Sequence, residues 1–416
     1  MDSISKLPVG RDRLINPHRL WSTIMEIARI GAIPGEGSCR LSLTDEDRQA
    51  RDLFATWCRE AGCDVRVDPY GNIFALRAGK SAGQPCILVG SHLDTQPHGG
   101  RFDGVLGVLA GLEIVRALND HEIETERSIV VVNWTNEEGV RFKPGLTGSA
   151  GFAGHLDPAV VTGSDGEDFF AELRRIGYAG AAMDDFDVLA YYELHIEQGP
   201  VLERADAAVG VVDGIQGVRW YEISLTGRDA HAGTTPMGNR KDSLMAAATI
   251  ALDLRARAMT YEPDLRFTIG HVRIEPNSVN TIPGHATLLI DLRHGYDDVL
   301  DGFEEIIAER VGKIADQEGV QSAFRRTMTV PPAVFDHSMQ ERLVEAARHA
   351  GIVPERLPSG AMHDASSMAR IVPTAMIFVQ SRDGISHNPA EWSSPGHVAT
   401  ACEVLARALL SHASES

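Results

Sequence analysis

A histidine and two aspartates follow a continuously apolar run, residues 86–89. His92 and Asp94 lie two positions apart after this run, and Asp103 follows a glycine-rich stretch. Residues two apart in an extended segment face the same way, so the Asp94 carboxylate is expected to orient the His92 imidazole through one nitrogen while the other nitrogen binds a metal. A lone histidine near a turn is more often structural, and the neighbouring acids favour a metal site only modestly.

Two adjacent carboxylates, Glu137 and Glu138, follow a second apolar run, residues 128–132. An acidic pair before a glycine is often only a solvated turn. However, the carboxyl end of a buried strand is where α/β sheets build their sites. If one carboxylate binds a metal, the other lies beside the metal's water, where a general base is required.

Two further histidines complete a possible ligand set. His195 lies in an extended, half-apolar segment, and His387 lies in a loop after a third apolar run, residues 375–379. Three histidines, an aspartate and a glutamate suit zinc, manganese, cobalt or nickel. The five cysteines are scattered without a C-x-x-C pair, so neither a thiolate zinc site nor a disulfide framework is expected.

The elements that must position these residues follow from the apolar pattern. The three continuously apolar runs predict buried strands of one largely parallel α/β sheet flanked by helices. Residues 220–226 instead alternate, which is typical of a sheet with one wet face, and a strand at 286–293 and helices at 241–258 and 297–317 accompany it. Helices are also expected at 20–30 and at 45–62, the latter capped by Thr44.

This order predicts an insertion. Residues 1–213 and 332–416 would form one α/β catalytic domain, and residues 214–331 would form an inserted α+β domain. The 416 residues include 43% hydrophobic side chains and carry a net charge of −19. A nucleic-acid or anionic-membrane surface is therefore not expected. Because no apolar run approaches about 20 residues and the first thirty residues lack a signal-peptide pattern, a cytoplasmic protein acting on small molecules is expected.

The order and context of these pieces resemble a known family, the dinuclear metal-dependent aminoacylase/carboxypeptidase-like (M20) amidohydrolases. Within it, the chain resembles the branch of N-carbamoyl-L-amino acid hydrolases, β-ureidopropionases (β-alanine synthases) and allantoate amidohydrolases. The joint match is specific although each piece alone is weak. The matching segments are residues 90–95, 99–104, 136–139, 193–200, 229–233, 276–280, 291–293 and 386–391.

The resemblance implies a pair of divalent metals, Zn²⁺ or Mn²⁺, Co²⁺ or Ni²⁺, bridged by Asp103. One metal would be held by His92 with His195 or His387, and the other by Glu138 with the remaining histidine. The sequence does not divide these histidines between the metals. Glu137 would be the general base and acid.

The resemblance also implies roles for residues of the insertion. Arg293 and Asn280 would clamp the substrate carboxylate, and His231, contributed by the partner subunit's lid, would stabilise the oxyanion. Gln216 and Gly360 are weaker candidates for the same pocket. By spacing alone, Arg293, Asn280 and His231 would be a surface cation, a turn residue and a loop residue.

The function that follows is hydrolysis of the carbamoyl (ureido) C–N bond of an N-carbamoyl amino acid by a metal-bound hydroxide, giving the amino acid, ammonia and CO₂. Allantoate hydrolysis ranks second, and an aminoacylase or peptidase third. A catalytically silent dimeric binding protein would be marked by missing ligands, and none is missing. The insertion would serve as lid and dimer interface of a homodimer. The substrate side chain, α or β preference, the metal and the pathway stay open.

Overall fold

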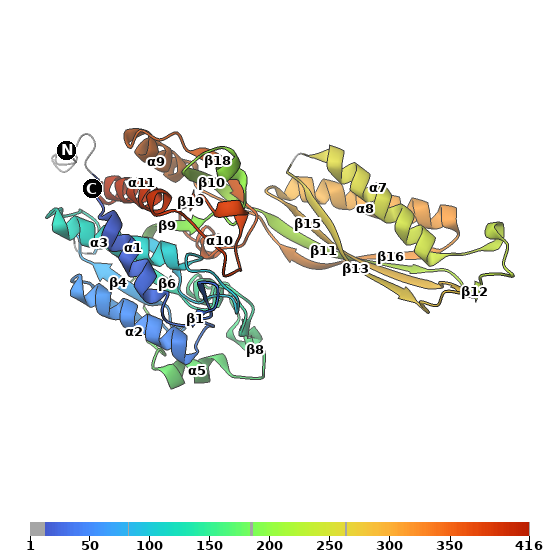
Figure 1. Cartoon of the computed structure of the whole chain (residues 1–416), viewed down its shortest axis with the longest axis horizontal. Helices are drawn as coiled ribbons and strands as arrows, with labels where there is room; N and C mark the ends of the chain where they lie inside the picture. The colour runs from blue at the N-terminus through green and yellow to red at the C-terminus, as the bar shows by residue number, and fades with distance from the viewer. Residues whose placement is uncertain (1–12, 82, 184–185, 263, 416) are drawn as a thin grey trace. The chain divides into compact units, whose positions relative to one another are not determined.

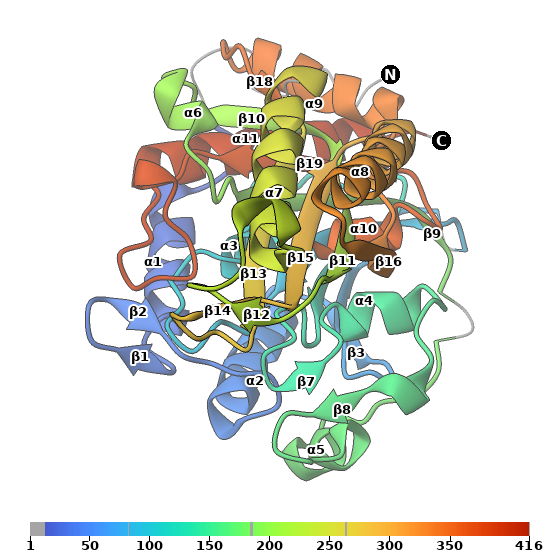
Figure 2. The same cartoon turned by 90° about the vertical axis from the view of Figure 1, so that its right-hand side faces the viewer.

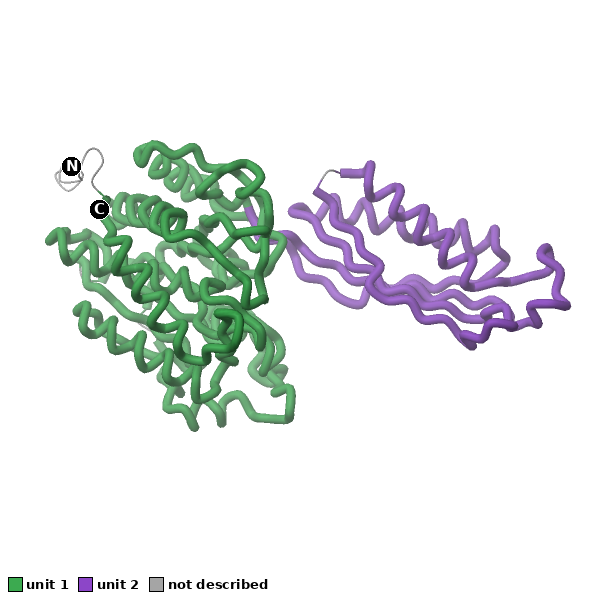
Figure 3. Tube along the Cα trace, viewed as in Figure 1, with its two compact units in different colours: residues 1–213, 334–416 green, residues 214–333 purple. Residues whose placement is uncertain are grey.

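The computed structural model describes residues 13–81, 83–183, 186–262 and 264–415 and divides them into two compact units. Unit 1 comprises residues 1–213 and 334–416, and unit 2 comprises residues 214–333 (Figure 3). Unit 1 is therefore discontinuous in sequence, and unit 2 is a single insertion within it. The N-terminal residues 1–12, on which part of the signal-peptide argument rests, lie outside the described residues.

Unit 1 is built on a nine-stranded mixed sheet, with the order β17-β10-β19-β9-β5-β6-β4-β3 and β18 paired with β10. Its four central strands, β19, β9, β5 and β6, are parallel, whereas β10 and β4, on either side of them, pair antiparallel; this confirms the expected mixed sheet with a parallel centre. The strands are β3 (Asp64–Val67), β4 (Ile73–Arg77), β5 (Cys86–His92), β6 (Ile129–Trp134), β9 (Val188–Ile196), β10 (Val209–Ile215), β17 (Ala333–Val334), β18 (Glu355–Ser359) and β19 (Thr374–Val379).

Helices flank this sheet (Figure 1). Helix α3 contacts β5, β6 and β9, and α11 contacts β9 and β19, so the central strands are covered by apolar helices. The helices of unit 1 are α1 (Pro17–Ile27), α2 (Asp45–Glu60), α3 (Val105–Asp120), α4 (Thr147–Phe152), α5 (Phe169–Ile176), α6 (Val201–Arg204), α9 (His337–His349), α10 (Asp364–Met368) and α11 (Pro395–Ala413), with the 3₁₀ turns η2 (Pro158–Val160) and η4 (Arg382–Gly384). Two small ribbons pair β1 (Ala32–Ile33) with β2 (Gly37–Ser38) and β7 (Phe142–Lys143) with β8 (Thr162–Gly163).

Capping explains where the first two helices begin. Thr44 accepts a hydrogen bond from the N–H of Asp47 and starts α2, as expected. Helix α1 starts three residues earlier than expected, because the Asn16 side chain caps it and Pro17 occupies its first position. The prediction for α1 relied on apolar periodicity alone and missed this cap.

Unit 2 is a four-stranded antiparallel sheet covered on one face by two helices, α7 and α8 (Figures 1 and 2). The strand order is β13-β15-β11-β16. Alternate residues such as Tyr221, Ile223 and Leu225 are buried under the helices, and their neighbours are more exposed. The elements are β11 (Gly217–Thr226), β12 (Ala230–His231), η3 (Met237–Asn239), α7 (Ser243–Tyr261), β13 (Arg266–Glu275), β14 (Thr281–Ile282), β15 (His285–His294), α8 (Asp297–Glu318) and β16 (Gln321–Val330).

The described residues show neither a helix suited to crossing a membrane nor a disulfide. Among the described residues, no helix combines the length and apolarity that crossing a bilayer requires. All five cysteines are free.

Candidate metal centre and active site

The candidate residues of unit 1 gather at the carboxyl ends of the four parallel strands. His92 is the last residue of β5, and His195 is the penultimate residue of β9. Glu137 and Glu138 follow β6, and His387 lies in the loop after β19. Strand pairing places His92 beside Trp134 and His195 beside Phe378, so the parallel register brings these strand ends to one edge.

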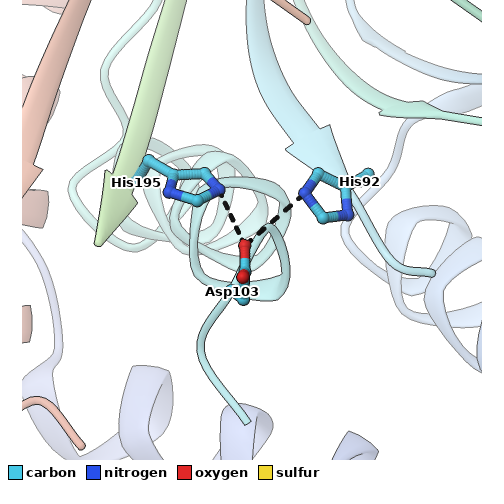
Figure 4. A group of neighbouring side chains, drawn as sticks. All are labelled: His92, Asp103 and His195. Carbon is cyan, nitrogen blue, oxygen red and sulfur yellow. Dashed lines mark ion pairs between the residues drawn. The ribbon is translucent and has the colours of Figure 1, made fainter. Parts of the chain in front are cut away.

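The first group of possible ligands is His92, Asp103 and His195, all buried (Figure 4). Asp103 Oδ1 lies 3.1 Å from His195 Nε2 and 3.8 Å from His92 Nε2, so one carboxylate oxygen faces both rings. Gly104 makes this approach possible. A Cβ at Gly104 would lie 2.3 Å from ring atoms of His92, and its φ of +67° also favours glycine.

The second group is Asp103, Glu138 and His387. His387 Nε2 lies 3.3 Å from Asp103 Oδ2 and 3.6 Å from a carboxylate oxygen of Glu138. Asp103 thus directs one oxygen to each group. The structure pairs His92 with His195 and separates His387 from them, a division that the sequence left open.

Hydrogen bonds fix how the two strand histidines present their nitrogens. His92 Nδ1 lies 2.9 Å from the carbonyl oxygen of Asp94, and His195 Nδ1 lies 3.0 Å from the carbonyl oxygen of Ile196. Since a carbonyl only accepts, each Nδ1 carries a hydrogen, and each Nε2 faces Asp103. Burial lowers the pKa of His92 to about 4, so its Nε2 presents a lone pair to a carboxylate.

This arrangement suits a cation. His92 Nε2 lies 3.5 Å from a carboxylate oxygen of Glu137 and 3.8 Å from one of Asp103, so when both acids are ionised the three atoms are all acceptors with no hydrogen between them. Glu138 Oε1 is buried and has no hydrogen-bond partner among the described residues. A buried acceptor without a donor is costly unless a cation binds it. The imidazole and carboxylate donors therefore fit divalent metals of the zinc type.

Because the carboxylates of this centre are buried close to one another, their pKa values are shifted. Burial and the charge of Glu138 raise the pKa of Glu137 well above its ordinary value, and burial and Asp103 do the same to the pKa of Glu138. Although burial opposes it, hydrogen bonding to His195 and His387 holds the pKa of Asp103 well below its ordinary value. Asp103 is therefore the carboxylate that stays ionised most readily.

Asp94 acts differently from the expectation. Its backbone carbonyl, not its carboxylate, bonds to His92; the nearer carboxylate oxygen lies 3.9 Å from Nδ1. The carboxylate instead accepts hydrogen bonds of 3.3 Å from the N–H groups of Glu137 and Glu138. The expected orienting atom was wrong because the regular strand β5 ends at His92, so the alternation assumed for residues 92 and 94 does not continue to Asp94.

Three non-glycine residues around the centre have left-handed backbone conformations. They are Asn136, directly before Glu137, with φ of +57°; Gln198, with φ of +57°; and His387, with φ of +52°. Such conformations cost free energy and persist where the surroundings enforce them. The side-chain amide of Asn136 donates to the carbonyl oxygens of Phe142 and Pro144, which holds the Glu137 loop in place.

Several residues at the centre, half-buried or buried, had no role assigned from sequence. Gln96 donates to Glu138, at 2.6 Å, and Gln198 donates to Asp103 Oδ2, at 3.0 Å. Glu193 and His363 form a third group with His195, and the rings of His195 and His363 lie 4.4 Å apart. Glu193 and His195 are two apart in one strand, which is a signal that the sequence offered. His363 lies far along the chain, and only the fold brings it here.

The candidate residues of unit 2 fall at opposite ends of its sheet. His231 pairs with Thr281 in the β12–β14 ribbon, and Ala232 donates its N–H to the carbonyl of Asn280, so His231 and Asn280 are neighbours. Arg293 pairs with Val218 at the other end of β15.

His285, where β15 begins on the ribbon side, and Arg293 are eight steps apart along the strand, roughly 26 Å at about 3.3 Å per residue. The structure therefore does not bring Asn280 and Arg293 of one chain together.

Local contacts define these side chains further. Nδ1 of His231 accepts hydrogen bonds from the N–H groups of Gly233 and Thr234, so Nε2 carries the hydrogen of the neutral ring. The Arg293 guanidinium donates to both oxygens of Asp291, at 2.9 and 3.1 Å. Gln216 is buried directly before β11, at the Arg293 end of the sheet, and Gly360 belongs to unit 1, after β18.

Comparisons with known proteins add independent findings. Residues 88–411 match the model of peptidase family M20/M25/M40. The chain is 42% identical to the N-carbamoyl-L-amino-acid amidohydrolase of Rhizobium meliloti, covering 96% of this chain and 97% of that protein. It is 33% identical to the allantoate amidohydrolase of Bacillus subtilis (strain 168), covering 88% and 91%. A crystal structure of a hydantoinase/carbamoylase family amidase from Burkholderia multivorans is similar, with a TM-score of 0.91, 44% identity and coverage of 96% and 98%.

Proposed function

Since the chain belongs to peptidase family M20/M25/M40, we propose that it is an amidohydrolase that cleaves the carbamoyl C–N bond of N-carbamoyl-L-amino acids. The products are the free amino acid, ammonia and CO₂. The observation that carries the proposal is the 42% identity, over nearly the full length of both chains, to an N-carbamoyl-L-amino-acid amidohydrolase. This reaction makes the protein a hydrolase that acts on C–N bonds of linear amides other than peptide bonds.

The proposed metal centre has two positions. His92, His195 and Asp103 Oδ1 would hold one divalent cation, and Asp103 Oδ2, Glu138 and His387 would hold the second. When bound, such cations would polarise the scissile carbonyl and lower the pKa of bound water. The proposal leaves zinc, manganese, cobalt and nickel as candidates, because imidazole and carboxylate donors suit all four.

Glu137 is the proposed general base and acid. Its carboxylate is buried beside the centre, and one oxygen lies 3.5 Å from His92 Nε2. From this position it takes a proton from the attacking water and delivers it to the leaving nitrogen. The Asp94 carboxylate accepts hydrogen bonds from the N–H groups of Glu137 and Glu138, which fixes the backbone that carries the base and the neighbouring ligand.

His231 and Arg293 are the proposed substrate contacts of unit 2. Because Nδ1 of His231 accepts from the backbone, the neutral ring donates through Nε2, which suits a developing oxyanion. Arg293, oriented by Asp291, offers a planar fork to the substrate carboxylate. A ureido acid is far shorter than the separation of Arg293 from Asn280. We therefore assign Arg293 and the pair His231–Asn280 of one chain to different active sites of a dimer.

A homodimer through unit 2 completes the proposal. Met245, Leu252 and Met259 are seven residues apart on α7 and are 49%, 67% and 73% exposed, an apolar stripe on the surface of the helix. Strand β13 is an edge of the four-stranded sheet, where unpaired backbone groups favour pairing with another strand. A second copy of the chain would cover both features. The free cysteines fit a reducing compartment. A cytoplasmic location of the protein is therefore part of this proposal.

A substrate panel tests the function. The purified protein, stripped with a chelator and reloaded with zinc, manganese or cobalt, is assayed for ammonia release from several N-carbamoyl-L-amino acids, their D forms, N-carbamoyl-β-alanine and allantoate. We expect metal-dependent turnover that is highest for L forms. Equal turnover of D and L forms, or full activity in metal-free protein, would contradict the proposal.

Allantoate hydrolysis is the second candidate, because allantoate is also a ureido acid and a curated relative at 33% identity is an allantoate amidohydrolase. The same donors and base would serve it. A kcat/KM for allantoate above that for every N-carbamoyl-L-amino acid in the panel would establish it in place of the first candidate.

A further inference from the structure

Glu391 joins the two loops that carry Asp103 and His387. Glu391 lies in the loop that joins β19 to α11, and it is 2% exposed. One oxygen, Oε1, accepts hydrogen bonds from the N–H groups of Phe102, at 2.9 Å, and Asp103, at 3.1 Å. The other oxygen lies 3.2 Å from the hydroxyl of Ser386, the residue before His387. The carboxylate thus contacts both loops at once.

The Ser386 hydroxyl extends this contact to the Asp103 side chain. It lies 3.0 Å from Asp103 Oδ2, the oxygen that faces His387. A tight turn keeps Glu391 near His387, because the Glu391 N–H donates to the carbonyl of Asn388. Glu391 therefore bonds to the backbone of Asp103 directly, and the Ser386 hydroxyl, which has one hydrogen to donate, lies within hydrogen-bond distance of both carboxylates.

Gly100 leaves the space that the Glu391 side chain fills. A Cβ at Gly100 would lie 2.1 Å from Oε1 and 2.5 Å from the Cβ of Glu391. The backbone of the 99–104 loop therefore packs directly against this carboxylate.

The two proposed metal positions are supported unequally. His92 and His195 belong to β5 and β9, whose ladders fix their backbones in the centre of the sheet. Glu138 and His387 both belong to loops, and His387 has a strained φ of +52°. The position at Asp103 Oδ2 therefore depends on contacts between loops for its geometry.

We propose that Glu391 is a positioning residue for this second metal position, holding Asp103 and the His387 loop at the spacing that a shared cation requires. The inference rests on the proposed function, since it takes the metal centre from it. Groups that orient metal ligands typically change metal affinity about 10- to 100-fold when removed. Loss of Glu391 should weaken the second position more than the first, because both share Asp103 but the first keeps two histidines whose backbones the strands hold.

The test measures Co²⁺ binding to the full-length chain by equilibrium dialysis and by the visible absorption of bound Co²⁺. Glu391→Leu should bind its second Co²⁺ about 10- to 100-fold more weakly than the wild type, with a smaller loss for the first. Glu391→Gln keeps an acceptor for the two N–H groups and should restore the second affinity and spectrum. Circular dichroism establishes that each variant is folded, and Glu391→Asp, which withdraws the carboxylate but keeps it polar, replaces the leucine variant if that fails to fold.

Glu403→Leu is the matched control. Glu403 is also a buried carboxylate that accepts backbone hydrogen bonds, from Leu14 and Ile15, and its partners lie outside the metal centre. This variant should lose thermal stability but bind two Co²⁺ like the wild type.

Unchanged affinity for both ions in folded Glu391→Leu, or in folded Glu391→Asp where it is the variant used, would overturn the inference. Wild type that binds two Co²⁺ but turns over no ureido acid would overturn the proposed function instead. Wild type that binds fewer than two ions would overturn both.

Discussion

The carbonyl oxygen of Asp94, 2.9 Å from His92 Nδ1, orients the imidazole of that proposed ligand. A main-chain acceptor cannot be removed by side-chain substitution, so the orientation of His92 is independent of the identity of residue 94. The Asp94 carboxylate is left to hold the Glu137–Glu138 segment. These two roles of one residue can be separated experimentally.

Asp94→Ala should lower kcat and weaken the second metal position, each by about 10- to 100-fold, because the backbone of Glu137 and Glu138 loses its acceptor. The first metal position should keep its affinity, since the carbonyl still orients His92. Co²⁺ titration together with steady-state kinetics separates the two effects. Selective loss of the first ion would instead restore the carboxylate as the orienting group.

Glu137→Gln should retain both metals and lose about 10²- to 10⁴-fold in kcat, the usual contribution of general acid–base catalysis. Glu138→Ala should lose one metal. Metal analysis and kcat are measured on both variants, with Glu124→Gln, an exposed acid outside the centre, as control. If both variants keep two metals and wild-type kcat, the acidic pair is only a turn.

Arg293→Lys should lower kcat/KM for N-carbamoyl-L-amino acids about 10- to 100-fold. The planar fork is lost although the charge remains, and a hydrogen bond to a charged group contributes about 1.5–3 kcal/mol. Arg325→Lys, an exposed arginine of the same sheet paired with Glu222, should behave as wild type. The idea fails if the wild type hydrolyses an N-carbamoyl amine without a carboxylate as fast as the acid.

Charge on the apolar stripe of α7 should dissociate the proposed dimer. The double variant Leu252→Glu and Met259→Glu places two carboxylates on exposed positions, so folding should be preserved while the apolar contact is lost. Sedimentation analysis should then give a monomer. Ala308→Glu, at an exposed position of α8, should remain dimeric; monomeric wild type would reject the interface altogether.

Mixing two inactive variants tests whether His231 serves the partner's site. In a heterodimer of His231→Ala with Glu137→Gln, one active site receives both defects and the other receives neither. Activity should therefore recover to about half the wild-type value per heterodimer if the sites act independently. No recovery in verified heterodimers would place His231 in its own chain's site or outside catalysis.

The sequence by itself was enough to predict the central strands of the sheet and the family. Buried strand segments such as 129–132 are continuously apolar, and local composition records that directly. The family match confirms the resemblance to M20 amidohydrolases. That resemblance could be read from the sequence because motifs such as residues 99–104 are contiguous. The types of the proposed ligands were visible for the same reason.

Only the tertiary structure decided how those residues combine. The grouping of His92 with His195 depends on strand order in the sheet, and the contact of Glu391 with Asp103 joins loops far apart in the chain. The separation of Asn280 from Arg293 follows from the register of β15. Each is a long-range relationship set by packing and strand pairing, whereas sequence periodicity reports only which face of its own element a residue occupies.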